Sequence, residues 1–327
     1  MSEPYIIAEA AQGYEGVPEI ARLLVKAAGA AGADAVKFQL VYVEELCERG
    51  YEHYDLFKSL EMSDSVWREL RGLADNLGMH FMFDVFGHRS LELANTLDAD
   101  GIKLHSTTFF ESDLVEATLA SGRSVYVSVG GVRESEILDF LAHEAPGHED
   151  QIVLLYGFQA EPTLLKDTRL ARVSALRAKT GLEVGFMDHA DGSGEDTVLL
   201  SAAALGFGVR VFEKHITLDR ELELEDYVSA LAPGEFADYV RSLRRLATAV
   251  GDASLELSDQ ELTYRSKAIK RVVASRDLEE GTAIDQGCVR LSRPAEPSGF
   301  FKLDDVIGRR VVREIADGKP VTQEDIV

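Results

Sequence analysis

The chain has few cysteines, few basic residues and no long apolar run. Its two cysteines, Cys47 and Cys288, lie far apart among 327 residues and match no metal-binding spacing, which indicates a reducing compartment, the cytoplasm. Lys and Arg number 34 against 57 Asp and Glu, for a formal net charge of -23. Nucleic acids and anionic membranes require basic patches, so neither is expected as a partner.

Neither a membrane span nor a secretory leader is expected. No apolar run is long enough to cross a bilayer, and the N-terminal residues do not place an apolar segment behind a basic start. With 46% hydrophobic and 28% charged residues, the composition predicts a soluble globular protein with a large core.

Short apolar segments alternate with amphipathic ones over the first 250 residues. The predicted strands are Tyr5–Glu9, Ala35–Gln39, His80–Phe83, Gly101–Leu104, Val125–Val129, Ile152–Gly157, Glu183–Asp188 and Val209–His215. Helices are predicted at Pro18–Ala31, Asp64–Leu77, Ser112–Ser121 and Gly194–Leu205. Eight strand–helix units in about 250 residues predict an α/β fold, a (β/α)8 TIM barrel. A doubly wound sheet is the rival, but no Gly-rich dinucleotide motif follows any strand.

The end of the chain differs in character. Residues 1–250 form the predicted barrel, residues 251–267 a polar linker, and residues 268–327 a small β-rich domain. Residues 276–284 resemble residues 313–321, which suggests two copies of one turn-and-strand unit. About sixty residues make a marginal core on their own.

Two histidines follow the last two predicted strands of the barrel. Asp188-His189 and Glu213-Lys214-His215 each place a carboxylate one or two residues before an imidazole. Parallel strands would deliver both imidazoles to the same end of the barrel. Two neutral imidazoles with nearby carboxylates predict a divalent-metal site, whereas a lone histidine would more often belong to the core or surface.

Polar side chains also end the other strands, where a TIM barrel builds its active site. They are Glu9, Lys37, Gln39, Asp84, Lys103, His105, Ser106, Ser128 and Gln159. Lysines with hydroxyl groups suit a phosphate or carboxylate anion, and a metal with open positions polarises a carbonyl. This set suggests making or breaking a carbon–carbon bond between an anionic three-carbon unit and an aldehyde. A Schiff base on Lys37 or Lys103 is an alternative from the same residues.

The motifs resemble the sialic acid synthase family, which condenses phosphoenolpyruvate with N-acetylmannosamine or a related amino sugar. The resemblance covers nearly the whole chain. The residues that carry it are Ile7-Ala8-Glu9, Val36-Lys37-Phe38-Gln39, Ile102-Lys103-Leu104-His105-Ser106, Val127-Ser128-Val129-Gly130, Asp188-His189, Phe212-Glu213-Lys214-His215, Asp226 and Ser292-Arg293-Pro294. The tail resembles the family's antifreeze-like (SAF) domain.

The resemblance implies a role for each site residue. His189 and His215 would hold a divalent metal, manganese or else magnesium, that binds the open-chain aldehyde. Glu9, Glu213 and Asp226 would orient water or sugar hydroxyls and move protons. The remaining predicted ligands of the two substrates are Lys37, Lys103, Ser106 and Ser128 for phosphoenolpyruvate, with Gln159 and Asp188. Arg293 would reach from the tail into the active site of the partner in a domain-swapped homodimer.

Two residues depart from the family pattern on the phosphate side. Asp84 stands where a Ser or Thr is usual, and Met187 replaces the Ser before Asp188-His189. A carboxylate about 4 Å from a phosphate is repulsive by roughly 1 kcal/mol or more. Two alternatives to the synthase therefore stay open: a barrel aldolase or lyase with a different donor, and a non-catalytic sugar-binding relative.

Overall fold

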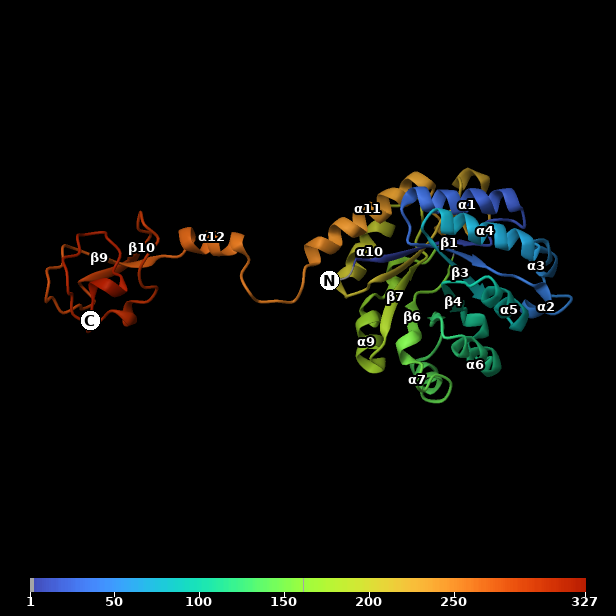
Figure 1. Ribbon diagram of the computed structural model, residues 1–327, viewed down its shortest axis with the longest axis horizontal. Coiled ribbons are helices and arrows are strands. Elements are labelled where there is room, and N and C mark those ends of the chain that lie inside the picture. The colour runs from blue at the N-terminus through green and yellow to red at the C-terminus, as the bar shows by residue number, and fades with distance from the viewer. Residues whose placement is uncertain (1–2, 161) are drawn as a thin grey trace. The chain divides into compact units, whose positions relative to one another are not determined.

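The structure is a computed structural model, and it describes residues 3–160 and 162–327. The chain divides into two compact units, Met1–Asp252 and Ala253–Val327. The first is built on a closed barrel of eight parallel strands (Figure 1). They are β1 (Tyr5–Ala11), β2 (Ala35–Gln39), β3 (His80–Val85), β4 (Gly101–Leu104), β5 (Ser124–Ser128), β6 (Ile152–Tyr156), β7 (Glu183–Asp188) and β8 (Val211–His215). The pairing of β1 with β8 closes the ring, so the predicted TIM barrel is confirmed.

Helices follow the strands around the barrel. They are α1 (Pro18–Ala31), α2 (Val43–Leu46), α3 (Tyr54–Ser59), α4 (Asp64–Asn76), α5 (His88–Thr96), α6 (Ser112–Ala120), α7 (Glu134–His143), α8 (Leu165–Thr168), α9 (Ala171–Thr180), α10 (Asp196–Gly206) and α11 (Pro233–Val250). Helix α1 has Pro18 in its first turn, and Gly32 ends it with φ of 81°. Throughout the described ranges, every helix is too short or too polar to cross a bilayer.

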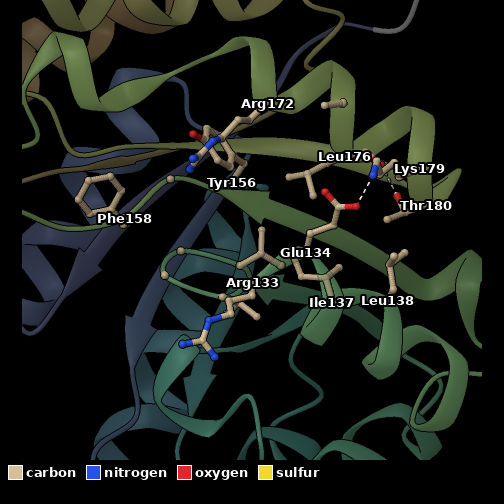
Figure 2. Close-up of a pocket in the computed structure, with 16 residues that line it drawn as sticks. Arg133, Glu134, Ile137, Leu138, Tyr156, Phe158, Arg172, Leu176, Lys179 and Thr180 are labelled. Atoms are coloured by element: carbon tan, nitrogen blue, oxygen red, sulfur yellow. Dashed lines mark hydrogen bonds and ion pairs between the residues drawn. The ribbon is translucent and has the colours of Figure 1, made fainter.

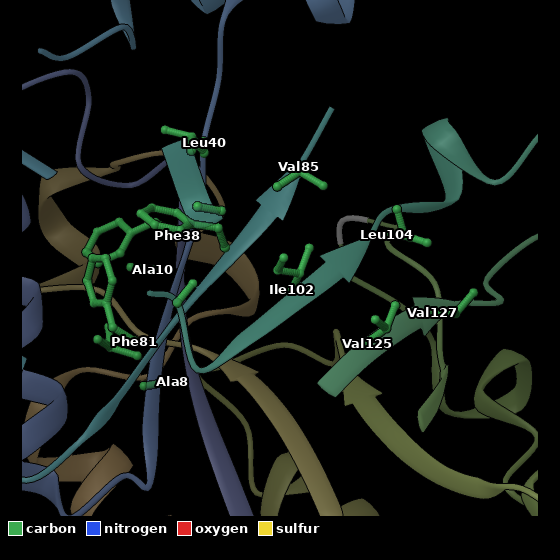
Figure 3. Close-up of a cluster of buried hydrophobic side chains, with 14 of the residues drawn as sticks. Ala8, Ala10, Phe38, Leu40, Phe81, Val85, Ile102, Leu104, Val125 and Val127 are labelled. Carbon is green, nitrogen blue, oxygen red and sulfur yellow. The ribbon is translucent and has the colours of Figure 1, made fainter. Parts of the chain in front are cut away.

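The strands carry apolar side chains on their outer faces. Phe38, Phe81, Ile102 and Val125 belong to one large cluster packed between the sheet and the helices (Figure 3). These residues are fully buried. This layer explains why the strands read as nearly continuous apolar runs in the sequence.

The barrel interior is layered. A small apolar layer contains Ile7, Ala35, Met82, Tyr126, Leu155, Met187 and Val211. Side chains alternate across a strand, so the residue two positions after an inward-facing one also faces inward. Above Ile7, Ala35, Met82 and Val211 the next inward positions are therefore polar, and they hold Glu9, Lys37, Asp84 and Glu213. The alternation thus builds a charged layer at the C-terminal end of the barrel.

The second unit has its own small core. Strands β9 (Arg271–Ala274) and β10 (Val289–Ser292) pair antiparallel, and Val272, Val289 and Val311 are among the buried core residues. Helix α12 (Asp259–Ala268) covers the second half of the predicted linker and the first residue of the predicted tail domain, and it begins at a capping box of Ser258 and Glu261.

The internal repeat of the tail, residues 276–284 and 313–321, forms a local pseudo-two-fold arrangement. Leu278 and Ile315, which occupy equivalent places in the two copies, each donate a backbone hydrogen bond to the other. Another pair of bonds is related in the same way. Gly281 N donates to Val311 O, and Gly318 N donates to Ala274 O, so that each residue is exchanged for its equivalent 37 positions away in the other copy. The two copies therefore stabilise each other by forming one shared core.

Candidate active site

Five charged side chains meet inside the barrel, and we call them the charged cluster: Glu9, Lys37, Asp84, Lys103 and Glu213. Each is at most 4% exposed. Lys37 forms ion pairs with Glu9 and Asp84, and its Nζ lies 3.5 Å from Glu213 Oε2. Lys103 Nζ donates to Glu213 Oε1 at 2.6 Å and lies 3.5 Å from Asp84 Oδ2. Buried charges of opposite sign compensate one another here, which is what keeps them inside the fold.

The cluster shifts the pKa values of Lys37, Lys103 and Glu213 in different directions. Burial lowers the pKa of Lys37 to about 8, although Asp84 and Glu213 act in the opposite direction. Burial also opposes the charge of Glu213, but Lys103 and Lys37 lower the pKa of that carboxyl to about 2. For Lys103 the effect of burial is outweighed by Asp84 and Glu213, which raise its pKa. Of these three residues, Lys37 is therefore the one whose pKa lies nearest to neutral pH.

His189, which follows β7, and His215, the last residue of β8, face each other beside the cluster. The ring centroids of His189 and His215 are 5.2 Å apart, and both side chains are buried. Burial lowers the pKa of His215 to about 3 and that of His189 well below its usual value. Both rings are therefore neutral at pH 7, which is the form that binds metals.

The pair fits a divalent metal ion in part. His189 Nδ1 is buried and has no hydrogen-bond partner within residues 3–160 and 162–327, and a metal ion would satisfy such an atom. In the same ranges, no group of three or more His, Cys, Asp or Glu side chains is placed to hold a metal ion. A metal held by His189 and His215 would therefore complete its coordination with water or substrate.

The loop that carries His189 is held from several sides. The carbonyl oxygen of His189 accepts hydrogen bonds from Thr163 N at 2.9 Å and from Ser229 Oγ at 3.1 Å. Buried Lys214 donates to the carbonyl of Ala190 at 2.9 Å. These bonds determine where the imidazole of His189 can point.

Asp188 is not brought to the charged cluster. Its Oδ1 accepts from Ala190 N at 2.8 Å, and its Oδ2 lies 3.4 Å from Lys214 Nζ. Met187 and His189 face the barrel interior, so Asp188 between them faces the helices. The predicted contact of Asp188 with substrate therefore has no support in this geometry, and the residue instead secures the loop of His189.

Asp226 and Gln159 meet at the mouth of the barrel. Gln159 Nε2 donates to Asp226 Oδ1, and Asp226 Oδ2 lies 3.8 Å from His215 Nδ1. Asp226 has φ of 63°, a conformation that costs a non-glycine residue energy and often marks a functional site. Burial raises the pKa of its carboxyl. The structure thus brings Gln159 and Asp226 to the histidine pair.

The predicted hydroxyl ligands lie on neighbouring strand ends. Ser128 is buried at the end of β5, and Ser106 begins a short 3-10 turn after β4. The two serines therefore lie at the C-terminal end of the barrel strands, as Lys103 does.

Arg293 belongs to the second unit, where its Nε donates to Ala268 O at 3.1 Å.

Two features of the site were missed by the sequence analysis. One is that Asp84 pairs with Lys37, and the other is that Lys214 supports the His189 loop. The alternation of side chains could have placed Asp84 inward beside Lys37. The role of Lys214 depends on β7 lying beside β8, which only the folded barrel shows.

Of the cavities at this end of the barrel, the two largest in the described ranges have different linings. The one at its mouth, which we call the mouth cavity, measures about 470 Å³ and is lined in part by Gln39, His105, Gln159 and Asp226. A second cavity of about 500 Å³ lies between α7 and α9, where Glu134 pairs with Lys179 (Figure 2). None of the predicted site residues lines this second cavity. The mouth cavity is therefore the candidate substrate site.

Comparison with known proteins gives consistent matches. A model of the NeuB family matches residues 24–254, and a model of the SAF domain matches residues 270–327. The chain is 27% identical to N,N'-diacetyllegionaminic acid synthase of Legionella pneumophila, over 98% of this chain and 94% of the relative. It is 26% identical to human N-acetylneuraminate-9-phosphate synthase, over 98% and 92% of the two chains.

A solved structure agrees with the sequence matches. That of N-acetylneuraminic acid (sialic acid) synthetase from Leptospira borgpetersenii superposes with a TM-score of 0.75 at 26% identity. The match covers 82% of this chain and 93% of that one. The resemblance drawn from the motifs and the SAF assignment of the tail are both confirmed.

Proposed function

The chain belongs to the NeuB family and ends in a SAF domain, and from this we propose that it condenses phosphoenolpyruvate with an amino-sugar aldehyde. The products are a nonulosonic acid, of the sialic type, and phosphate. Relatives named as synthases of acidic sugars support a synthase. The observation that carries the proposal is the neutral histidine pair beside two buried lysines at one end of the barrel.

Phosphoenolpyruvate would bind beside Lys37 and Lys103. Both ammonium groups suit its phosphate and carboxylate, and the hydroxyl groups of Ser106 and Ser128 can donate to the same oxygens. The two lysines are held by three carboxylates of the charged cluster. The donor therefore competes with these carboxylates for the lysines, and the charge of Asp84 limits its affinity.

The aldehyde would bind on the other side, next to the histidines. His189 and His215 would hold a divalent ion, manganese or magnesium, which when bound polarises the carbonyl oxygen of the aldehyde. Gln159 would donate hydrogen bonds to the sugar. Asp188 would contribute indirectly, because its carboxylate secures the loop that carries His189.

Proton movements fall to the carboxylates and Lys37. Asp226, whose pKa burial raises, would hold a proton beside the carbonyl oxygen that becomes a hydroxyl group. Glu9 and Glu213 would accept hydrogen bonds from water and orient it toward the donor carbon that loses phosphate. Lys37, with a pKa of about 8, would bind the donor as an ammonium and exchange a proton near neutral pH.

The tail and its assembly complete the proposal. Arg293 would add a cation to the active site of the partner subunit in a homodimer. The cytoplasmic location predicted from the two cysteines is part of the same proposal. The proposal also includes the predicted division into a barrel of residues 1–250, a linker of residues 251–267 and a tail domain of residues 268–327.

The proposal is tested by phosphate release. The full chain with manganese and phosphoenolpyruvate is expected to release inorganic phosphate only when an N-acylated amino-sugar aldehyde is added. A chelator should remove the activity, and added manganese should restore it. Absence of phosphate release with every sugar of a six-carbon panel would contradict the proposal.

A second candidate function rests on the pairing of Asp84 with Lys37. A buried lysine with a lowered pKa can form a Schiff base with a carbonyl donor, and Asp84 disfavours a phosphate beside it. Such an aldolase or lyase would use pyruvate. Replacing phosphoenolpyruvate by pyruvate in the same reaction and measuring the pyruvate that remains discriminates, because consumption of pyruvate with no use of phosphoenolpyruvate would favour this second candidate.

Replacing Asp84 by serine is expected to tighten phosphoenolpyruvate binding. The change removes one negative charge from the charged cluster while Glu9 and Glu213 still hold Lys37. We expect the Kd for phosphoenolpyruvate, measured by calorimetry, to fall by about 10-fold. Asp113→Ser, which changes an exposed side chain of α6, is the matched control and should leave the Kd unchanged. Weaker binding to Asp84→Ser would show instead that Asp84 supports the donor site.

A further inference from the structure

The cavity between α7 and α9, which we call the interhelical cavity, lies outside the charged cluster and the histidine pair. It is bounded by the two helices and by the loops that follow β5 and β6 (Figure 2). Its volume of about 500 Å³ is in the range of sites that enclose small molecules. The reaction proposed above makes no use of this cavity.

Four charged side chains line the interhelical cavity, and only one of them is acidic. Lys179 pairs with Glu134 (Figure 2), and Arg133 Nη1 lies 3.1 Å from Glu136 Oε1. Arg172 forms no ion pair with any residue in the ranges 3–160 and 162–327. Because each of the two pairs is neutral as a whole, Arg172 leaves the cavity with one positive charge, in a chain whose net charge is -23.

Most of the remaining lining is apolar. On α7, Ile137 and Leu138 follow Glu134 at the three- and four-residue spacing that puts side chains on one face of a helix. On α9, Leu176 follows Arg172 at the same four-residue spacing. Ile137 is buried, Leu176 is half-buried and Leu138 is 39% exposed. A ligand that covers this apolar surface removes it from water, which favours binding of an apolar body.

The two hydroxyl groups of the lining already have acceptors within the protein. Tyr156 Oη donates to Thr168 O at 2.9 Å, and Thr180 Oγ1 donates to Leu176 O at 2.9 Å. Their protons are therefore not available to a ligand. Arg172, which lies beside Tyr156 (Figure 2), is the charged donor of the cavity that has no carboxylate of its own.

A single guanidinium matches a single carboxylate. Its planar N–H groups can donate two parallel hydrogen bonds to the two carboxylate oxygens, and the two unit charges balance. A phosphate monoester carries about −1.5 to −2 charges at pH 7, which is more than Arg172 balances, and Glu134 would repel the excess. Since a helix rises by about 1.5 Å per residue, Leu176 lies about 6 Å beyond Arg172 along α9, which suits a body the size of a phenyl ring.

We propose that the interhelical cavity is a binding site for a small monocarboxylate with an apolar or aromatic body. Arg172 holds the carboxylate, and Ile137, Leu138 and Leu176 contact the body. The site is separate from the reaction at the barrel mouth, and the inference does not depend on the proposed function.

Calorimetric titration of three compounds into the full chain separates the two kinds of contact. 3-Phenylpropionate carries both the carboxylate and the ring, 3-phenylpropanamide lacks the charge, and acetate lacks the ring. We expect 3-phenylpropionate to bind saturably, and each of the other two to bind at least about 5-fold more weakly. Absence of saturable binding by 3-phenylpropionate overturns the inference, and so does equally tight binding of the amide or of acetate.

Two variants locate the bound carboxylate. Arg172→Leu changes an exposed side chain and should weaken binding of 3-phenylpropionate by at least about 5-fold, whereas Arg68→Leu, on the exposed face of α4, should not. Ala175→Phe, which keeps the charge and fills the cavity with a ring, should abolish binding. Undiminished binding in Arg172→Leu or in Ala175→Phe would place the carboxylate elsewhere, as on Lys37 and Lys103, and would overturn the inference. These titrations do not measure phosphate release, so failure of the proposed function leaves the test intact.

Discussion

Replacing His215 by alanine is expected to abolish both turnover and stabilisation by manganese. His189 and His215 are the only two imidazoles of the described ranges whose rings meet at this site, so either loss leaves a single protein ligand. At manganese 100-fold above its Kd, the lost binding corresponds to about 2.7 kcal/mol of unfolding free energy. We expect kcat for phosphate release to fall by at least ~10²-fold, as when other charge-stabilising groups are removed.

The metal-free melting temperature separates this effect from simple destabilisation. His215 is buried, so His215→Ala lowers the metal-free melting temperature to some extent, and the shift on adding manganese is the quantity compared. His143→Ala on α7, an exposed histidine, is the control and should keep the full shift. An unchanged manganese shift in His215→Ala would show that the metal binds elsewhere.

Replacing Lys37 by methionine is expected to cause the largest loss of stability in the barrel. Lys37 is fully buried and pairs with Glu9 and Asp84. Without it, three buried carboxylates share Lys103 alone, and breaking a buried pair of this kind costs about 3–5 kcal/mol. Urea unfolding should show this decrease, and phosphoenolpyruvate binding should weaken by at least about 10-fold because one donor cation is lost.

Restoring the charge balance is the control. Lys37→Met combined with Asp84→Ser removes one charge of each sign and should recover more than half of the lost stability. Lys179→Met, which removes an exposed pair with Glu134, should cost at most about 1 kcal/mol. If Lys37→Met unfolds at the same urea concentration as the unchanged protein, the buried carboxylates are neutral rather than paired.

The barrel could be predicted from the sequence because its signals are local. Each strand is a short apolar run, and residues such as Pro18 and Gly32 mark where the helix between two strands begins and ends. No predicted strand end differs from the observed one by more than two residues. The histidine pair was predictable for the same reason, since parallel strands end at one face of the barrel. In these elements the local pattern and the global fold agree.

The direction in which individual side chains point, into the barrel or toward the helices, was less predictable than the strands themselves. Asp188 and His189 are adjacent, so one must face the interior and the other the helices. The strands are apolar on both faces, and composition therefore hides which of the two faces inward. The sequence predicted a metal ligand at His189 and a substrate contact at Asp188, whereas the barrel places His189 beside His215 and Asp188 beside Lys214.

By itself, the sequence determined the eight strand–helix units, the separate tail and the residues at the strand ends, because periodicity and capping are properties of neighbouring residues. Only the tertiary structure decided which charges meet. Asp84, Lys37 and Lys103 come from three strands, and their pairing depends on the register of β2, β3 and β4. Closure of β1 on β8 likewise brings Glu9 and Glu213 to the same lysine. Such contacts join distant parts of the chain, and no local pattern encodes their distances.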